Sequence, residues 1–191
     1  MTIKNAAECF SPNVRACVIG IGISNIPLIG MLLDAGVKVE ARDAKASDKL
    51  SPEVQSLANR GLALKCGERY LDGIDADIIF RSPGLRPDLP EIEAAVKRGA
   101  LLSSEMELFF ELCPAFLIGI TGSDGKTTTT SYIYSLLSEM TKRAGRGRVY
   151  VGGNIGAPLL PLYREMTSSD FAVAELSSFQ LMTMKKSPDT S

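Results

Sequence analysis

The chain places a strand, a glycine-rich loop and a helix in succession between residues 115 and 140, and this order limits its fold more than any other feature. The apolar residues 115–120 predict a strand, and residues 128–140 predict a helix. Between them the chain reads Thr-Gly-Ser-Asp-Gly-Lys-Thr-Thr, residues 121–128. Two glycines let backbone N–H groups surround an anion, and the positive end of the following helix points at it. We therefore expect a phosphate-binding loop at the edge of a parallel α/β sheet.

Two side chains of this loop would complete a nucleotide site. Lys126 supplies a mobile positive charge for the outer phosphates, and the Thr127 hydroxyl is a ligand for the Mg²⁺ ion that bridges them. The loop is shorter than the standard Gly-x-x-x-x-Gly-Lys pattern, because Ile120 stands where that pattern has its first glycine. The alternative is an ordinary glycine-rich turn with a solvated lysine.

The N-terminal half of the chain begins like a dinucleotide-binding fold. A strand over residues 16–19 leads into Gly20-x-Gly22, a helix-like run ends at Gly36, and a second strand over 37–41 is followed by Asp43. In such a β-α-β unit the helix start binds a diphosphate, and the acidic residue accepts hydrogen bonds from a ribose or a base. This geometry suits a nicotinamide cofactor or a uridine diphosphate, and a tight turn without a ligand is the remaining alternative.

Further candidate residues follow other apolar strands. Glu175 would either complete the Mg²⁺ shell with Thr127 or serve as an acid at the start of a helix. Asn154 would either fill a left-handed turn or direct its amide at a phosphoryl or carboxylate oxygen. The stretch Ser82-Pro83-Gly84 ends a buried strand, and an ordinary turn explains it when it is taken alone.

Composition indicates an ordinary soluble protein. The 191 residues carry a net charge of −1, and 45% are hydrophobic and 23% charged, so we expect neither a nucleic-acid nor a membrane surface. The apolar run 16–33 contains glycines, Asn25 and Pro27, which fit a strand, a turn and a helix better than a membrane span. Four widely spaced cysteines match no metal-binding pattern and indicate reduced thiols, so we expect a cytoplasmic protein. The chain has no histidine, so a histidine base or metal ligand would have to come from elsewhere.

Three short stretches occur in order: residues 121–128, Gly-Gly-Asn-Ile-Gly at 152–156, and Glu-Leu-Ser-Ser-Phe-Gln-Leu at 175–181. Together they resemble the Mur ligase family, the ATP-dependent amide ligases of peptidoglycan precursor synthesis. Residues 20–43 and 82–84 also resemble the uridine-nucleotide domain of this family, in the branch that joins D-glutamate to UDP-N-acetylmuramoyl-L-alanine. The resemblance covers nearly the whole chain.

The resemblance implies a fold, a reaction and a set of binding residues. It implies a Rossmann-like parallel-sheet domain over residues 1–112, followed by the first part of a P-loop-type ATP-binding α/β domain over 113–191. ATP would phosphorylate the free carboxylate of UDP-N-acetylmuramoyl-L-alanine, and the amine of D-glutamate would attack the acyl phosphate. Catalytic roles would fall to Lys126, Asn154 and Glu175, and the Mg²⁺ ligands would be Thr127 and Glu175. ATP would be bound by Gly122, Ser123, Asp124, Gly125, Lys126, Thr127 and Thr128, and the UDP-substrate by Ile23, Ser24, Asp43, Ser82, Gly84, Asn154 and Ser177.

The chain departs from the family pattern in two respects. Asn25 stands where a glycine is expected after Ser24, and the chain ends in a polar tail before the histidine, the modified lysine and the C-terminal domain of the family. We therefore expect a fragment that forms no product alone, within a full-length protein that is a monomer. The alternatives are another ligase of the superfamily such as a folylpolyglutamate synthase, an NAD-dependent oxidoreductase, and an inactive uridine-nucleotide-binding module. Residues 1–110 argue against the first, and the second leaves the phosphate loop and Glu175 unexplained.

Overall fold

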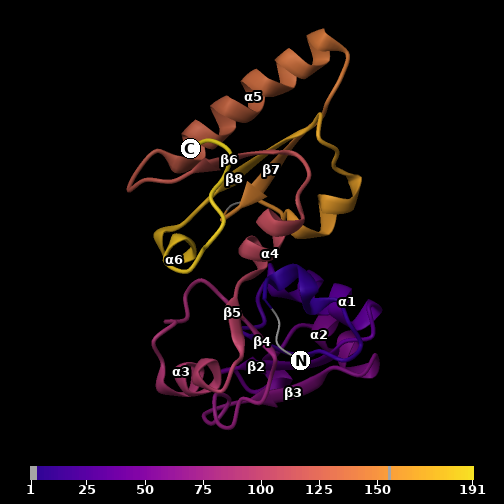
Figure 1. The fold of residues 1–191 in the computed structure, drawn as a ribbon, viewed down its shortest axis with the longest axis vertical. Helices are drawn as coiled ribbons and strands as arrows, with labels where there is room; N and C mark the ends of the chain where they lie inside the picture. The colour runs from indigo at the N-terminus through magenta and orange to yellow at the C-terminus, as the bar shows by residue number, and fades with distance from the viewer. Residues whose placement is uncertain (1–3, 155) are drawn as a thin grey trace. The chain divides into compact units, whose positions relative to one another are not determined.

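The computed structural model describes residues 4–154 and 156–191, so Ile155 of the Gly-Gly-Asn-Ile-Gly stretch lies outside the described residues. The chain divides into two compact units, Met1–Glu105 (unit 1) and Met106–Ser191 (unit 2) (Figure 1). The division lies at the start of helix α4 (Glu105–Leu112), whereas the boundary expected from the sequence lies at its end. Each unit has its own parallel sheet, which confirms the expected α/β fold.

Unit 1 is built on five parallel strands in the order β3-β2-β1-β4-β5. The strands are β1 (Arg15–Ile19), β2 (Lys38–Asp43), β3 (Ala63–Cys66), β4 (Ile78–Arg81) and β5 (Leu101–Ser103). The chain runs outward from β1 through β2 to β3, then returns to the other side of β1 and continues through β4 to β5. The strand order therefore reverses between β1 and β4. Ligands of open parallel sheets bind outside the carboxyl ends of the strands at such a reversal.

Three α-helices and the 3₁₀ helix η2 connect these strands, and a second 3₁₀ helix, η1, precedes β1. They are α1 (Asn25–Asp34), α2 (Pro52–Asn59), α3 (Pro90–Lys97), η1 (Ala6–Cys9) and η2 (Ser47–Lys49). Helix α1 ends as the sequence predicts, because Gly36 takes φ +76° and its N–H donates to the Leu33 carbonyl. The apolar run that begins at residue 16 is thus divided between β1, the glycine loop and α1. No helix within residues 4–154 and 156–191 is long and apolar enough to cross a membrane.

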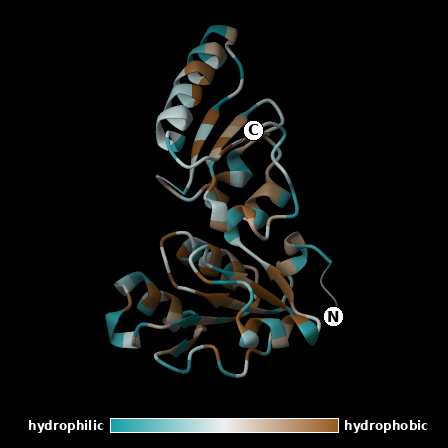
Figure 2. Cartoon of the chain, turned by 90° about the vertical axis from the view of Figure 1, so that its left-hand side faces the viewer, coloured by the Kyte–Doolittle hydropathy of each residue, from teal (hydrophilic) through white to brown (hydrophobic). Residues whose placement is uncertain are grey.

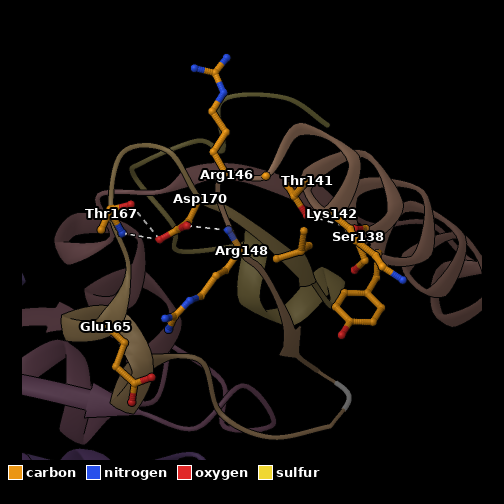
Figure 3. Close-up of a pocket in the computed structure, with 12 residues that line it drawn as sticks. Ser138, Thr141, Lys142, Arg146, Arg148, Glu165, Thr167 and Asp170 are labelled. Carbon is orange, nitrogen blue, oxygen red and sulfur yellow. Dashed lines mark hydrogen bonds between the residues drawn. The ribbon is translucent and has the colours of Figure 1, made fainter.

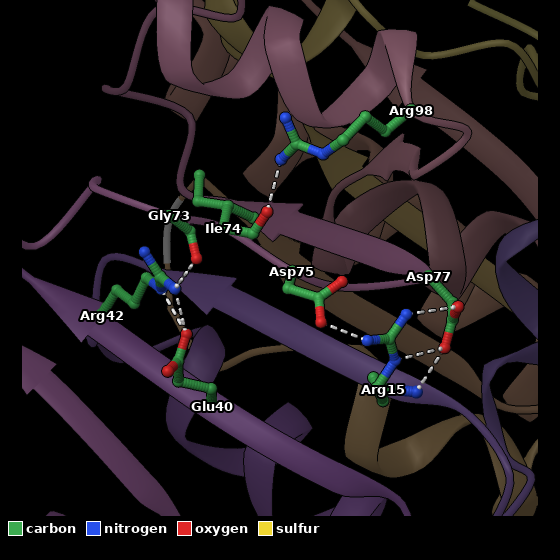
Figure 4. Close-up of polar contacts among 8 residues, drawn as sticks. All are labelled: Arg15, Glu40, Arg42, Gly73, Ile74, Asp75, Asp77 and Arg98. Atoms are coloured by element: carbon green, nitrogen blue, oxygen red, sulfur yellow. Dashed lines mark hydrogen bonds and ion pairs between the residues drawn. The ribbon is translucent and has the colours of Figure 1, made fainter.

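The connection from β3 to β4, residues 67–77, forms no helix and is held instead by arginine side chains (Figure 4). Arg42 is 2% exposed and donates three hydrogen bonds of 2.8–3.1 Å to this loop. The acceptors are the carbonyls of Tyr70, Asp72 and Gly73 for Arg42, the Ile74 carbonyl for Arg98, and the carboxylates of Asp75 and Asp77 for Arg15. The guanidinium groups of Arg42 and Arg98 thus donate hydrogen bonds to backbone carbonyls of this loop, which backbone N–H groups would bind in a helix.

Unit 2 is built on three parallel strands in the order β6-β8-β7. Its elements are α4, β6 (Phe116–Ile120), α5 (Lys126–Ala144), β7 (Val149–Gly153), η3 (Leu160–Glu165), β8 (Phe171–Glu175) and α6 (Ser178–Leu181). Because β8 lies in the middle, Glu175 is in register with Ile120 on one side and Gly153 on the other. The loops that follow the three strands therefore leave the sheet at the same edge.

Helix α5 packs on this sheet through one of its sides. Ile133 and Leu137 contact the buried side chains of β6 and β8, and Figure 2 shows hydrophobic and hydrophilic residues alternating along the helix. On its other side Tyr132, Leu136 and Met140 are exposed. The helix is thus held by the sheet, and its first turn is fixed next to the loop that follows β6.

The polar segment after α6 is bound to the edge of β6. Asp189 N–H donates to the Leu117 carbonyl at 2.9 Å, and Gly119 N–H donates to the Thr190 carbonyl at 2.9 Å. Pro188 lies over Gly119, where a Cβ would be 2.8 Å from the Pro188 Cγ. The segment therefore adds a short parallel pairing to β6, and glycine at position 119 makes room for it.

Candidate functional site

The phosphate loop of unit 2 connects β6 to α5, and its residues 121–125 are exposed. Gly122 and Gly125 have φ values of +147° and +74°, in the range that favours glycine. Gly125 is also the N-cap of α5, so the first N–H groups of a 19-residue helix begin at this loop. The loop therefore offers both backbone donors and the positive end of a helix to an anion.

Lys126 lies back over the loop instead of extending into solvent. Its ammonium group donates to the carbonyls of Gly122 and Ser123, at 2.8 and 3.1 Å. Both acceptors are neutral, so a phosphate oxygen is the stronger acceptor for the same ammonium group. The lysine is thus held close to the place where an anion would meet the loop.

Glu175, Thr127 and Asn154 meet at the ends of β8 and β7 and the start of α5. Glu175 is 2% exposed, and the Thr127 hydroxyl donates to its Oε2 at 2.9 Å. The Asn154 side-chain amide lies 3.4 Å from Oε1, and the Asn154 N–H donates to the Glu175 carbonyl at 2.8 Å. Asn154 does not have a positive φ, so the left-handed turn considered for it is wrong. One buried carboxylate is therefore fixed beside the first turn of α5.

Helix α6 begins at Ser178, three residues beyond Glu175. Ser177 is its N-cap and forms a capping box with Gln180, in which Gln180 N–H donates to Ser177 Oγ at 3.3 Å and Ser177 N–H donates to Gln180 Oε1 at 2.8 Å. Glu175 therefore belongs to β8 and is not an acid at the start of the helix. The hydroxyl of Ser177, which the sequence associates with substrate binding, is engaged by α6.

The oxygen atoms of Glu175 and Thr127 fit a Mg²⁺ ion. Mg²⁺ prefers oxygen ligands, retains several waters, and is usually held by one or two protein groups together with substrate phosphates. Within residues 4–154 and 156–191, no cluster of three or more His, Cys, Asp or Glu side chains could hold a metal by itself. The pair thus suits an ion shared with a bound nucleotide better than a structural metal.

In unit 1 the glycine loop lies at the strand reversal, between the ends of β1 and β4. Gly20 has φ +87°, and a Cβ on it would lie 1.7 Å from Ser82 Oγ. The Ser82 hydroxyl donates to the Ile19 carbonyl at 2.8 Å and so joins the two strand ends. Asn25 is 3% exposed, and its side-chain amide donates to the Gly20 carbonyl at 2.7 Å. Asn25 therefore closes this turn, a role that the family pattern of glycine at this position did not reveal.

Asp43 holds the same loop from the end of β2. Its Oδ2 accepts from the Ile21 N–H at 2.8 Å, and its Oδ1 accepts from the Lys45 N–H at 2.9 Å. Burial, and after it the Asp43 charge, raises the pKa values of Cys66 and Tyr70, so both side chains stay protonated at neutral pH. A carboxylate oxygen has two lone pairs, so Asp43 retains acceptor capacity for a ligand.

At two positions near the strand reversal, neither backbone strain nor packing within the protein requires a glycine. Gly22 and Gly84 do not have a positive φ, and a Cβ on either would meet no atom within 4 Å. Both are exposed, as is Ile23 at 78%, and Ser24 is the N-cap of α1. A glycine that the fold does not require is typical of a place where a ligand approaches the backbone. The residues expected to bind the UDP-substrate in unit 1 are thus gathered on the two loops that leave β1 and β4, with Asp43 beside them.

A hollow of about 690 Å³ lies at the other edge of unit 2, around the C-terminal end of α5 (Figure 3). Asp170 on its wall is 4% exposed. Burial alone would raise the pKa of its carboxyl, but the N–H groups of Arg148 and Thr167 and the Thr167 hydroxyl lower that pKa overall. Arg146 points away from this hollow (Figure 3). The hollow contains none of the residues expected from the sequence, and Asp170 ties together the turns before β7 and β8.

Known proteins resemble this chain over both units. The Mur ligase middle domain matches residues 120–189, and the N-terminal domain of MurD-like Mur ligases matches residues 14–103. A UDP-N-acetylmuramoylalanine–D-glutamate ligase of Ruminiclostridium cellulolyticum is 47% identical over 190 residues, which are 97% of this chain and 40% of that relative. The protein of the same name from Clostridium botulinum strain Okra is 50% identical over 178 residues, 93% of this chain and 38% of that relative. The chain thus spans about two fifths of the length of these curated relatives.

Among solved structures, a UDP-N-acetylmuramate:L-alanyl-gamma-D-glutamyl-meso-diaminopimelate ligase from Neisseria meningitides aligns with 84% of this chain and 52% of its own. Its sequence identity of 23% and TM-score of 0.45 are too low to bear on fold or function. The two domain matches are more informative, because one contains the phosphate loop and Glu175 and the other contains the strand reversal of unit 1. On these matches and the similarity to the curated relatives, the chain belongs to the Mur ligase family.

Proposed function

We propose that this chain carries the ATP-binding and uridine-nucleotide-binding parts of an ADP-forming ligase that joins D-glutamate to UDP-N-acetylmuramoyl-L-alanine in peptidoglycan precursor synthesis. The observation that carries the proposal is the 2.9 Å contact between Thr127 and Glu175 beside the phosphate loop. A buried carboxylate bonded to a hydroxyl of the first helical turn is the arrangement that a Mg²⁺ ion shared with phosphates requires. The relatives that are 47% and 50% identical carry the name of this ligase, which supports the choice of substrates.

In the proposed reaction the terminal phosphoryl group of ATP passes to the free carboxylate of the UDP-substrate, and ADP leaves. The amine of D-glutamate then attacks the acyl phosphate, loses a proton and forms the amide, and inorganic phosphate leaves. Such transfers depend mainly on positioning and on neutralising negative charge. Bound Mg²⁺ would supply part of that neutralisation.

The side chains of unit 2 would divide this work. The N–H groups of residues 122–125 and the start of α5 would orient the phosphates of ATP, while Lys126 would exchange two loop carbonyls for phosphate oxygens. Thr127 and Glu175 would hold the Mg²⁺ ion. The Asn154 amide, next to Glu175, would donate to an oxygen of the reacting carboxylate.

The two loops of unit 1 would bind the other end of the UDP-substrate. The loop after β1, which contains Ile23 and Ser24, would meet the diphosphate at the start of α1. Asp43 would accept a hydrogen bond from the ribose or the base. Gly84 would let the nucleotide approach the loop after β4, because no side chain occupies that space.

Calorimetric titration of the 191-residue chain tests this proposal. The ligands are ATP with Mg²⁺, UDP-N-acetylmuramoyl-L-alanine, and NADH as the comparison. We expect saturable binding of the first two and none of NADH. Binding of NADH in place of the UDP-substrate would favour the oxidoreductase alternative, and binding of the UDP-substrate without ATP would favour the inactive module.

Two variants assign the sites to their units. Lys126→Ala should weaken ATP binding by roughly 10- to 100-fold, since a charge-assisted contact to phosphate is lost, and should leave the UDP-substrate unaffected. Asp43→Ala should weaken binding of the UDP-substrate and leave ATP binding unaffected. Lys142→Ala is the matched control, because Lys142 is an exposed lysine in the last turn of the same helix. Unchanged ATP binding in Lys126→Ala would remove Lys126 from the proposed site.

We also propose that the 191-residue chain forms no amide by itself. We assign the loops after β1 and β4 to binding the UDP end of the UDP-substrate, and the phosphate loop to binding ATP. We assign no residue to binding D-glutamate. Mass spectrometry of a mixture of the chain with all substrates and Mg²⁺ is the measurement, and a peak at the mass of the amide product would contradict the proposal.

A further inference from the structure

Arg81, the last residue of β4, is buried against the loop that follows it. The residue is 2% exposed. Its Nη1 lies 3.3, 3.2 and 2.8 Å from the carbonyl oxygens of Ser82, Pro83 and Leu85. An arginine keeps its positive charge at every pH of interest. The loop therefore curls around a buried cation, with its carbonyl groups directed inward.

This arrangement fixes the direction of the N–H groups on the loop. None of the described peptide bonds is cis, and in a planar trans peptide the N–H points away from the C=O of the preceding residue. Because the Pro83 and Leu85 carbonyls point at Arg81, the N–H groups of Gly84 and Arg86 point outward. Within the part of the chain that the structure describes, neither N–H has an acceptor. Two backbone donors without a backbone acceptor thus face outward beside the strand reversal.

Gly84 strengthens this interpretation. It is exposed, it does not have a positive φ, and a Cβ on it would touch no atom within 4 Å. Neither backbone strain nor packing therefore requires glycine at this position. Its effect is to leave the outward N–H uncovered for a ligand that approaches the backbone.

We propose that Arg81 is a positioning residue of the uridine-nucleotide site. It holds the loop 82–86 so that the N–H groups of Gly84 and Arg86 donate to the diphosphate oxygens of the bound nucleotide. Arg81 does not touch the ligand, and it acts through the carbonyls that it binds. The inference rests on the proposed function, because it requires a uridine diphosphate at this edge of unit 1.

Titration of the folded chain with UDP and with uridine is the first arm of the test. Arg81→Met should raise the Kd for UDP about 10-fold, because two donors lose their orientation, and should not change the binding of uridine relative to wild type. Arg81→Lys keeps the charge and can donate from its ammonium group, but its shorter side chain lacks the planar guanidinium that fills this site. Its Kd for UDP should therefore lie between those of wild type and Arg81→Met. Circular dichroism verifies that each variant is folded.

Arg42→Met is the matched control. Arg42 is equally buried and also binds three carbonyls, but these belong to the loop 70–73. We expect this variant to lose stability while its Kd for UDP stays within about 2-fold of wild type. An Arg42→Met variant that weakens UDP as much as Arg81→Met does would reduce the role of Arg81 to general stability.

The second arm uses the wild-type chain alone and does not depend on the folding of any variant. In ¹H–¹⁵N spectra the amide signals of Gly84 and Arg86 should shift when UDP saturates the chain. Absence of these shifts, or a folded Arg81→Met variant that binds UDP as tightly as wild type, would overturn this inference alone. A folded wild-type chain that binds no UDP would overturn the nucleotide site and this inference with it.

Discussion

Glu175 is a buried carboxylate beside the phosphate loop. A carboxylate at 2% exposure is tolerated only when hydrogen bonds or cations replace the water it has lost. Thr127 donates to one of its oxygens, and the Asn154 amide approaches the other. Both hydrogen-bond partners of this carboxylate are neutral groups. A cation would therefore interact with it more strongly than either of them does.

Replacing Glu175 by glutamine should separate metal binding from stability. The amide oxygen can still accept from Thr127, so we expect the free energy of unfolding to change by no more than about 1 kcal/mol. ATP binding in the presence of Mg²⁺ should weaken about 10-fold or more, because an anionic ligand of the ion is lost. Calorimetry with and without Mg²⁺ measures this, with Glu139→Gln on the exposed side of α5 as the control. A variant that retains the full effect of Mg²⁺ on ATP affinity would contradict the assignment.

Asp170 makes the stability of unit 2 depend on pH. Its carboxylate accepts from two N–H groups and a hydroxyl, and its pKa is lowered overall despite burial. A carboxyl whose folded pKa lies below its unfolded value of about 3.9 contributes stability above that value. This contribution is lost as the pH falls through the folded pKa.

We expect Asp170→Asn to lower the free energy of unfolding by about 2 kcal/mol at pH 7, since an NH₂ group replaces an acceptor among N–H donors. The difference from wild type should begin to shrink below the unfolded pKa of about 3.9 and should continue to shrink as the pH falls through the lower folded pKa. Urea titrations at several pH values measure it, and Glu165→Gln, an exposed residue of the same hollow, is the control. A difference that does not vary with pH would show that the carboxylate charge is not its source.

At the scale of secondary-structure elements, the edge of β6 is the feature that ties the last residues of the chain to the phosphate site. Asp189 and Thr190 both donate to the Leu117 carbonyl, at 2.9 and 3.2 Å. This pairing covers backbone groups that would otherwise form an open strand edge. It also lies on the strand that leads directly into the phosphate loop.

Gly119→Ala should release this segment, because the new Cβ would lie 2.8 Å from Pro188 Cγ. Hydrogen exchange at the amides of Asp189 and Thr190 should then accelerate by about 10-fold or more, as their acceptor is lost. Adding Pro188→Ala to the same chain removes the ring atom and should restore much of the protection. Slow exchange in the single variant would mean that the strand edge can shift to accommodate a side chain.

The elements differ in how clearly the sequence predicts them, for physical reasons. β6 is a buried apolar run, and the strand predicted over residues 115–120 agrees with Phe116–Ile120 to within one residue. β3 (Ala63–Cys66) was not predicted, because it is a half-buried edge strand with a lysine in it and shows no apolar run. The β3–β4 connection was also not predictable, since arginines bind its carbonyls and a carbonyl acceptor leaves no trace in the sequence.

The candidate sites show the same contrast. Thr127 follows one predicted strand, and Glu175 ends another. Because the carboxyl ends of parallel strands meet at one edge of a sheet, the sequence predicts that these two residues lie close together. The contacts of Asn25 and Arg81 could not be predicted, because their acceptors are backbone carbonyl groups of nearby loops, which every residue type supplies. Side chains that bind a ligand directly have a recognisable pattern, whereas side chains that position the backbone have none.

At the scale of the whole molecule, each of the two units has its own sheet and its own candidate ligand. We therefore expect UDP to stabilise unit 1 and ATP with Mg²⁺ to stabilise unit 2, each by about 2.7 kcal/mol at 100 times its Kd. Hydrogen exchange followed by mass spectrometry assigns the protection to peptides of either unit. Protection of unit 2 by UDP alone would show that the sites are coupled. Lys126→Ala is the control, because it should reduce the effect of ATP and leave the effect of UDP unchanged.

The close contact of Pro188 with Gly119 also constrains how this sequence can evolve. A mutation that gives position 119 a side chain is tolerated only if position 188 loses its ring or the C-terminal segment gives up its place on β6. Among homologous sequences the two positions should therefore vary together, although they lie in different parts of the chain. Selection on the strand before the phosphate loop is, through this one contact, also selection on the segment that follows α6.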